Sequence, residues 1–141
     1  MKRLSLILIL FSLSITAYAQ EIMDVPPEAE GIEKALNYYL DGGTNNDFET
    51  LKKAFHPDAR MIWMTDATQN VNAVEFFGSR MQAGPPQDRE TRIVAMDISE
   101  GVASARLEIE YETFMFVDYM TLLEIDGEWK IVSKVFTRIN K

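Results

Sequence analysis

Apolar residues recur every three or four positions in the first half of the chain, which is the spacing of one face of a helix. Residues 28–40 show this most clearly, and the helix is expected to end at the glycine pair that starts with Gly42. A second, shorter helix is predicted from an N-cap at Asn46 to Pro57. A third is predicted over residues 72–82. Three helices are therefore predicted between residues 28 and 82.

Alternation of apolar and polar residues predicts five β-strands, four of them in the second half of the chain. One strand is expected before the third helix and four long ones after it, over residues 59–65, 91–99, 102–113, 116–126 and 128–140. Two of the connections, at residues 100–101 and 126–127, have the composition of two-residue hairpin turns. Helices followed by long antiparallel strands favour a single α+β domain, with the helices laid on one face of the sheet.

The turn at residues 126–127 sets which residues of the last two strands face each other. This register places Asp118 on the apolar face, opposite Val135. A carboxylate there is costly unless it is paired or hydrogen-bonded. Asp118 is therefore either a general base, or protonated donor, at the floor of a pocket, or a structural carboxylate. In the second case its partners would be Tyr38, Tyr39 or backbone N–H groups.

The opposite face of this hairpin has a different character. It carries the three cations of the last strand, which are Lys130, Lys134 and Arg138. The register therefore leaves Asp118 without an obvious cationic neighbour. Tyr119, Val132 and Phe136 interrupt the charged face, and apolar residues in such a place often mark a contact surface. We expect a homodimer through this outer face, with these three residues near its centre.

The start of the chain has the order of a secretory signal. Residues 1–19 begin with two basic residues, continue with an apolar stretch too short to span a bilayer comfortably, and end in a small-x-small site at Ala19. We expect cleavage there, a flexible leader over residues 20–27 and a folded domain over residues 28–141. Gln20 stands where a lipoprotein needs a cysteine. The expected location is periplasmic or secreted, with no membrane contact after cleavage.

Composition narrows the chemistry. The chain has no cysteine and one histidine, which rules out disulfides and disfavours a transition-metal site. Its net charge of −8 disfavours nucleic acid as a partner. No phosphate loop, dinucleotide fingerprint or nucleophile elbow is present, so no cofactor is predicted. His56 is either a cation or hydrogen-bonding group at a helix end, or the partner of Asp118 in an acid–base dyad.

Four segments in order resemble the putative lumazine-binding, SnoaL-like branch of the nuclear transport factor 2-like superfamily. They are GIEKALNYYLDG at residues 31–42, AFHPDA at 54–59, DYMTLL at 118–123 and WKIVSKVF at 129–136. The resemblance implies a cystatin-like cone, in which a strongly bent antiparallel sheet wraps around N-terminal helices and a pocket opens between them. Members include ketosteroid isomerases, dehydratases and proteins without known catalysis, and dimers through the outer sheet face are frequent.

Such a cone predicts a pocket lined largely by apolar side chains. The expected lining residues are Tyr38, Tyr39, Trp63, Phe76, Phe77, Met120 and Ser133. The aromatic ones either pack in the core or present flat faces to a ligand. Three functions stay open. The first is an exported carrier or sensor of a small, largely apolar molecule. The second is a cofactor-free lyase or isomerase with Asp118 as base, alone or with His56, and the third is an interaction module whose cavity its own side chains fill.

Overall fold

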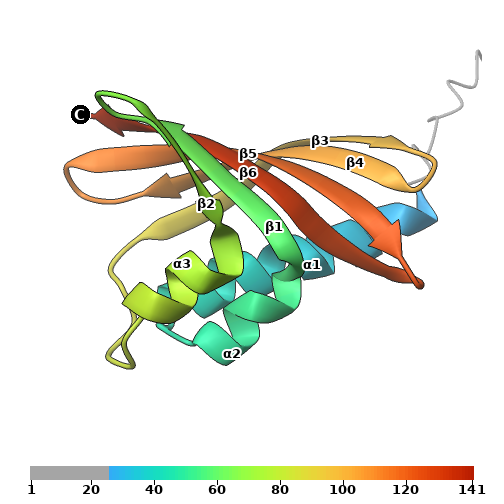
Figure 1. The fold of residues 1–141 in the computed structure, drawn as a ribbon, viewed down its shortest axis with the longest axis horizontal. Coiled ribbons are helices and arrows are strands. Elements are labelled where there is room, and N and C mark those ends of the chain that lie inside the picture. Colours follow the sequence, from blue (N-terminus) through green and yellow to red (C-terminus); the bar gives the residue numbers. More distant parts are fainter. Residues whose placement is uncertain (1–25) are drawn as a thin grey trace, which may run out of the picture.

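The computed structural model describes residues 26–141 (Figure 1). In this part of the chain the elements are α1 (Pro27–Thr44), α2 (Phe48–Leu51), the 3-10 helix η1 (Lys52–Ala54), β1 (Phe55–Met64), β2 (Thr68–Asn72), α3 (Ala73–Arg80), β3 (Glu90–Ser99), β4 (Val102–Glu110), β5 (Phe114–Ile125) and β6 (Glu128–Asn140). The expected signal peptide, residues 1–19, and most of the expected leader lie outside the described residues. Among the helices described, none is long and apolar enough to cross a membrane.

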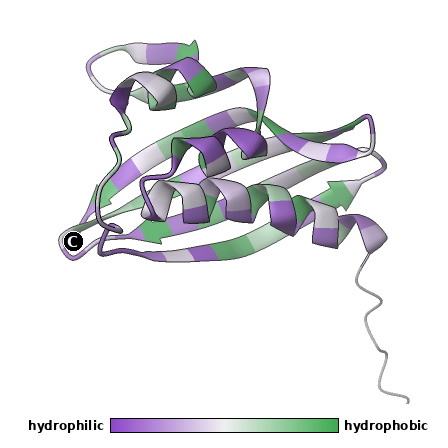
Figure 2. Cartoon of the chain, turned by 90° about the horizontal axis from the view of Figure 1, so that it is seen from below, coloured by the Kyte–Doolittle hydropathy of each residue, from purple (hydrophilic) through white to green (hydrophobic). Residues whose placement is uncertain are grey.

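All six strands form a curled sheet in the order β2-β1-β6-β5-β4-β3. β1 runs parallel to β6, and the other neighbours are antiparallel. α1, α2 and α3 lie against one face of the sheet (Figures 1 and 2). The α+β cone expected from the sequence is confirmed. β2 was missed because its sequence, TQNVN, is polar and lacks a clear alternation of apolar residues.

α1 begins at Pro27, a position where a helix has no use for the missing N–H. The glycine pair that was predicted to stop this helix lies inside it, because α1 continues to Thr44. Gly42 has a packing role instead: a Cβ built there would collide with the backbone of Leu51. The glycine therefore lets α2 lie directly against α1, and it does not stop the helix.

The second helix is shorter than predicted. Its N-cap is Asp47, whose side chain accepts a hydrogen bond from the Thr50 N–H at 3.1 Å, while Asn46 has a left-handed φ of 53°. The chain is already extended at Phe55, so Pro57 lies within β1 and does not end a helix. The capping pattern thus predicted the start of this helix to within one residue, because the N-cap is Asp47 and not Asn46.

The core lies between α1 and the inner face of the sheet. It is built from α1 residues at helical spacing and from strand residues at alternate positions: Ile32, Leu36 and Tyr39 on the helix, and Leu107, Ile109, Met120, Leu122 and Ile131 on the strands. Burying one Leu or Ile side chain contributes about 1.5–3 kcal/mol, so this layer is the main source of stability.

One extra residue in β6 changes the register of the last hairpin. Leu122 pairs with Ile131 as the turn predicts, but Thr121 pairs with Ser133, so Val132 is a β-bulge. A two-residue turn fixes the pairing only as far as the first bulge, and the sequence carries no evident sign of this one.

Beyond the bulge, inside and outside are exchanged along β6. Asp118 is buried as predicted, but it pairs with Phe136 instead of Val135. Lys134 and Phe136 now face inward, and Val135 is exposed. The expected outward positions of Lys134 and Phe136 are therefore wrong, and so is the expectation that no cation lies near Asp118.

A second bulge lies in the first hairpin. Ile93 pairs with Leu107 and Ala95 with Arg106, which leaves Val94 as the extra residue. Val94 is exposed, whereas regular pairing would place it on the inner face. Bulges bend a strand and increase its twist, so the two together help to curl the sheet around the helices.

Candidate functional site

A pocket of about 290 Å³ opens between the helices and the inner face of the curled sheet. Its apolar lining comes from every layer of the fold: Leu51, Met61, Phe76, Phe77, Met81, Ile109, Phe116 and Phe136. Its polar side chains are Tyr39, Gln87, Arg89, Tyr111 and Lys134. Because this space is open, a cavity filled by the protein's own side chains, the third function considered above, is disfavoured.

α3 supplies one aromatic wall. Asn72 caps this helix by accepting a hydrogen bond from the Glu75 N–H at 2.9 Å, which stabilises the first turn of the helix that carries Phe76 and Phe77. The Phe77 ring lies 6.0 Å from the ring of Tyr39, and the two rings of α3 are 5.8 Å apart. These packed aromatic faces give the pocket a rigid apolar side.

Trp63 supports this wall from behind. Its ring lies 5.6 Å from Phe76 and stacks on Phe136 at 5.5 Å, so it contacts two lining rings without lining the pocket. Any molecule that enters the pocket should therefore change the surroundings of Trp63 through one layer of side chains.

A buried polar cluster forms the floor, made of Asp118, Lys134 and Tyr39. The Tyr39 hydroxyl donates to Oδ2 of Asp118 at 2.7 Å, and Nζ of Lys134 lies 2.5 Å from Oδ1. Asp118 is 0% exposed, Lys134 4% and Tyr39 5%. Pairing with a cation and a hydroxyl offsets the cost of burying the carboxylate. Tyr39 and Lys134 line the pocket, whereas Asp118 lies behind them.

Burial sets the protonation behaviour of this cluster. Loss of water lowers the pKa of Lys134 from its usual value, although the charge of Asp118 acts in the opposite direction. Burial, together with the nearby charge of Asp118, raises the pKa of Tyr39 well above its usual value. Tyr39 is therefore held as a neutral hydrogen-bond donor. Arg89 lines the same pocket, and its positive charge lowers the pKa of both groups.

Lys134 also contacts aromatic rings. Its Nζ lies 4.2 Å from the ring centroid of Phe136 and 5.4 Å from that of Tyr39. A cation close to an aromatic ring is attracted by it, more strongly in a site without water. These rings and Asp118 together hold the ammonium group at the pocket floor.

Arg89 comes just before β3, and its guanidinium group lies against the C-terminal end of α1. It donates to the Leu40 carbonyl at 3.1 Å, to Oγ1 of Thr44 at 2.9 Å and to the Tyr111 hydroxyl at 3.0 Å. The end of a helix carries partial negative charge, which favours a cation there. A Cβ at Gly43 would collide with the guanidinium group, so this glycine provides the space that Arg89 occupies.

Gln87 completes the polar side of the pocket. Its Oε1 accepts a hydrogen bond from the Tyr111 hydroxyl at 2.8 Å, and its Nε2 donates to the Gly43 carbonyl at 2.8 Å. Sequence analysis missed Gln87, Arg89 and Tyr111. The first two follow a Pro-rich break with no periodicity, and Tyr111 comes directly after the end of β4. Only the three-dimensional arrangement brings the three residues to the pocket.

The predicted lining residues are placed as follows. Tyr39, Phe76 and Phe77 line the pocket, and Trp63 packs behind it. Met120 is buried in the core, while Tyr38 and Ser133 are half-buried and lie outside the lining. For Ser133 the reason is the bulge at Val132, which moves it out of the inward-facing series. Tyr38 instead lines a separate, smaller hollow beside Trp129.

His56 does not contact Asp118. Its Nδ1 accepts a hydrogen bond from the Asp58 N–H at 3.1 Å, and the side chain is partly exposed on β1. The partners of Asp118 are Tyr39 and Lys134, so the structure does not bring the proposed acid–base dyad together.

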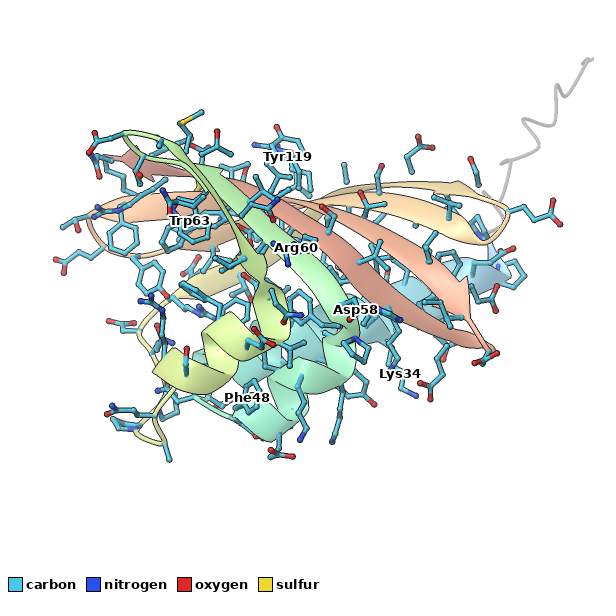
Figure 3. The ribbon with its side chains drawn as sticks, in the orientation of Figure 1. Lys34, Phe48, Asp58, Arg60, Trp63 and Tyr119 are labelled. Atoms are coloured by element: carbon cyan, nitrogen blue, oxygen red, sulfur yellow. The ribbon has the colours of Figure 1, made fainter. Side chains whose placement is uncertain are left out.

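Tyr119 lies on the other side of the sheet. Figure 3 shows its side chain on the face turned away from the helices, and it is 56% exposed. Its cross-strand neighbour is Val135, also exposed, and not Lys134 as the unbulged register suggests.

Residues 27–137 match the family described as "Putative lumazine-binding". The chain belongs to this family. The resemblance inferred from the four sequence segments is thereby confirmed. The family's description names lumazine, but it gives no ligand or reaction for this chain.

Solved structures agree on the superfamily. A nuclear transport factor 2-like protein of unknown function from Methylobacillus flagellatus is 31% identical, with a TM-score of 0.70 over 82% of this chain and 94% of that one. Another from Shewanella baltica is 25% identical, with a TM-score of 0.71 over 79% and 93%. A ketosteroid isomerase-like protein from Erwinia carotovora atroseptica, 16% identical, has a TM-score of 0.67 over 83% and 100%, which shows the fold alone.

A curated relative has an enzymatic name. Aldolase FrzH from Cladobotryum sp is 21% identical to this chain over 101 residues, which are 70% of this chain and 81% of the relative. The proteins to which this chain is similar thus include one named as an enzyme and others of unknown function.

Proposed function

We propose that this member of the lumazine-binding family is an exported protein that binds a small, flat, largely apolar molecule in the pocket. The observation that carries the proposal is an open space of about 290 Å³ with aromatic walls and a few convergent polar groups at its floor and one side. Small-molecule sites have this composition: the apolar lining gives affinity and the polar groups fix orientation. Flat rings on α3 and β6 favour a flat ligand.

Catalysis is the second candidate, because the buried cluster on the pocket floor contains groups that can move a proton. The reading of Asp118 as a base acting directly on a ligand finds less support, since both its oxygens are engaged and it does not line the pocket. A lyase or isomerase of this design would act through Lys134 or Tyr39, the members of the cluster that face the space. The names of the aldolase and the ketosteroid isomerase-like relatives support such a reaction class.

We also propose that the protein forms a homodimer through the outer face of the sheet. Tyr119 and Val135, both exposed and adjacent across β5 and β6, would lie near its centre. Of the other two residues expected there, Phe136 no longer belongs to this proposal because it lines the pocket, and Val132 is half-buried at the bulge.

Binding can be tested with a flat neutral probe, 2-naphthamide, titrated into mature protein by calorimetry. Saturable binding is expected. Met81→Trp should weaken it about tenfold or more, because Met81 lines the pocket and the larger side chain would fill part of the space. Met64→Trp is the matched control, since Met64 is an exposed methionine outside the lining. Failure of the probe to bind, or equal effects of the two substitutions, would count against this function.

A further inference from the structure

We propose that the ligand is a flat organic anion, such as an aromatic carboxylate, whose charged oxygens lie between Arg89 and Lys134. The inference rests on the proposed binding function and goes beyond it by naming the chemical class of the ligand. It depends on the balance of charges around the pocket and on N–H groups that no acceptor occupies.

The lining carries two cations and no carboxylate. Arg89 and Lys134 line the pocket, and Asp118, the carboxylate that touches this lining, is already held by Lys134 and Tyr39. One positive charge is therefore left over, in a chain whose net charge is −8. The lining of the pocket is therefore positively charged, although the chain as a whole has a net negative charge.

Arg89 differs from the arginines of the adjoining sheet. Arg92 and Arg106 both pair with Glu108, at 2.8 and 2.7 Å. All three hydrogen bonds of Arg89 go to uncharged oxygens, and no carboxylate of residues 26–141 lies within 4.0 Å of it. Arg60, Arg80 and Arg138 lack acidic partners too, but they are exposed and water can solvate them. Among these arginines, Arg89 is the half-buried one without a carboxylate within 4.0 Å, although Asp88, Glu90 and Glu110 border a neighbouring hollow that it also lines.

Donors remain free at both cations. An arginine has five N–H groups, and three of those of Arg89 are in use. A lysine ammonium has three, and within the described residues the polar contact of Lys134 is the one to Asp118. Lys134 is 4% exposed and its Nζ lies 4.2 Å from the ring centroid of Phe136, so its remaining N–H groups have little contact with bulk water. A carboxylate would supply acceptors to both cations.

The two cations also disfavour each other. The charge of Arg89 is among the causes that lower the pKa of Lys134. An anion placed between them would replace this repulsion with two attractions, and the aromatic walls would cover its flat apolar body. The field inside a low-dielectric cleft strengthens such an interaction relative to open water.

The test compares 2-naphthoate with 2-naphthamide, two probes of the same shape that differ in charge. Titration calorimetry at neutral pH is expected to give a dissociation constant about tenfold or more lower for the carboxylate, which corresponds to about 1.4 kcal/mol. Arg89→Gln should bring the two affinities within about a factor of two. Arg138→Gln, which removes an exposed arginine of β6 outside the lining, should leave the preference unchanged.

The outcomes separate the two levels of the proposal. If the amide binds as tightly as the carboxylate, the inference is overturned while the binding function stands. If neither probe binds, the binding function itself fails. If chloride or inorganic phosphate displaces 2-naphthoate as well as an excess of benzoate does, the site selects a simple anion and the assignment to flat organic anions is wrong.

Arg89 also ties the end of α1 to Tyr111, so its replacement could impair folding. The ratio of affinities in the unmodified protein decides the question without any variant. Arg89→Lys adds an independent check, since it keeps the charge and should keep most of the preference for the carboxylate.

Discussion

At the scale of single residues, Asp118 and Lys134 form the contact on which the pocket floor depends. Burying an ion pair brings little net stability, but breaking one leaves a charge without water or partner. Tyr39 adds a neutral donor to the same carboxylate. Removing one of these three side chains alone is therefore expected to cost more stability than its own hydrogen bond or ion pair contributes.

Asp118→Asn is expected to lower the free energy of unfolding by about 3–5 kcal/mol, because it leaves the Lys134 ammonium buried without a counter-ion. Denaturant unfolding followed by circular dichroism measures the change. Asp97→Asn, at an exposed aspartate of β3, is the control and should change stability by less than about 0.5 kcal/mol. Similar losses in the two variants would contradict the ion pair.

The raised pKa of Tyr39 predicts that the stability of the protein depends on pH in the alkaline range. Its folded pKa is raised well above 10.0, so the stability that it contributes is fully present below pH 10. Above that pH the unfolded chain loses the phenol proton while the folded protein keeps it, and this contribution declines. The cost of Tyr39→Phe, read as the difference in free energy of unfolding from the unmodified protein, should therefore shrink between pH 10 and pH 11.5. A cost of Tyr39→Phe that stays the same from pH 8 to pH 11.5 would contradict the raised pKa of Tyr39.

At the scale of elements, two glycines of α1 explain why the helix packs closely. Gly42 lies directly against Leu51 of α2, and Gly43 lies against the side chain of Arg89. Sequence reasoning treated this pair as the end of the helix, which is the commonest role of glycine there. The close approach that requires glycine is visible only when the second element is in place.

Gly42→Ala should destabilise the protein by about 1–3 kcal/mol, although alanine is the better helix former, because the new methyl group would collide with the backbone of Leu51. Gly84→Ala is the matched control: its nearest neighbours are 3.9 Å from a built Cβ, an ordinary contact, and it should be close to neutral. Thermal unfolding of the two variants side by side gives the comparison. A Gly42→Ala protein as stable as the control would show that α2 can move away.

Most of the elements could be predicted because each depends on its own residues. The period of α1, the alternation along β4 and the turns at residues 100–101 and 126–127 are local signals. The bulges at Val94 and Val132 are not, since a bulge is favoured by how the whole sheet bends. For this reason the burial of Asp118 was predicted correctly, while its partner Lys134 was assigned to the wrong face.

The candidate site shows the same limit. Tyr39, Phe76 and Phe77 could be predicted, because large aromatic side chains on the inner side of a helix pack either in the core or at the wall of a pocket. Gln87, Arg89 and Tyr111 could not, because they reach the pocket from a connection and a strand end. The sequence therefore predicted neither the polar side of the pocket nor its excess of positive charge.

At the scale of the whole molecule, the cone has an inner face that surrounds the pocket and an outer face that is open. The outer face carries Tyr119 and Val135 side by side. Adjacent exposed apolar residues of this kind favour association. The order of the elements and the curl of the sheet follow the superfamily to which the chain belongs.

A homodimer through this face predicts that light scattering at micromolar concentration gives twice the mass of the mature chain. Tyr119→Glu should shift the protein to the monomer, because it would place a charge at the centre of each copy's contact. Glu124→Gln, at an exposed position on the same strand, should leave the dimer intact. A monomer at every concentration would contradict the proposed assembly.

Export predicts that protein recovered from the native cell envelope or medium begins at Gln20. N-terminal sequencing reads this directly. Intact Met1 on protein from the soluble cytosolic fraction would be incompatible with a cleaved signal.

The central claim, that the pocket takes a small flat molecule, is tested most directly by following the indole N–H signals of the two tryptophans by NMR. Trp63 packs against two rings that line the pocket, whereas Trp129 lies by a separate hollow. Titration with 2-naphthoate is predicted to shift the Trp63 signal, assigned by its loss in Trp63→Phe, until it saturates, while the Trp129 signal stays in place. No saturable change at Trp63, or equal shifts at both tryptophans, would contradict the account.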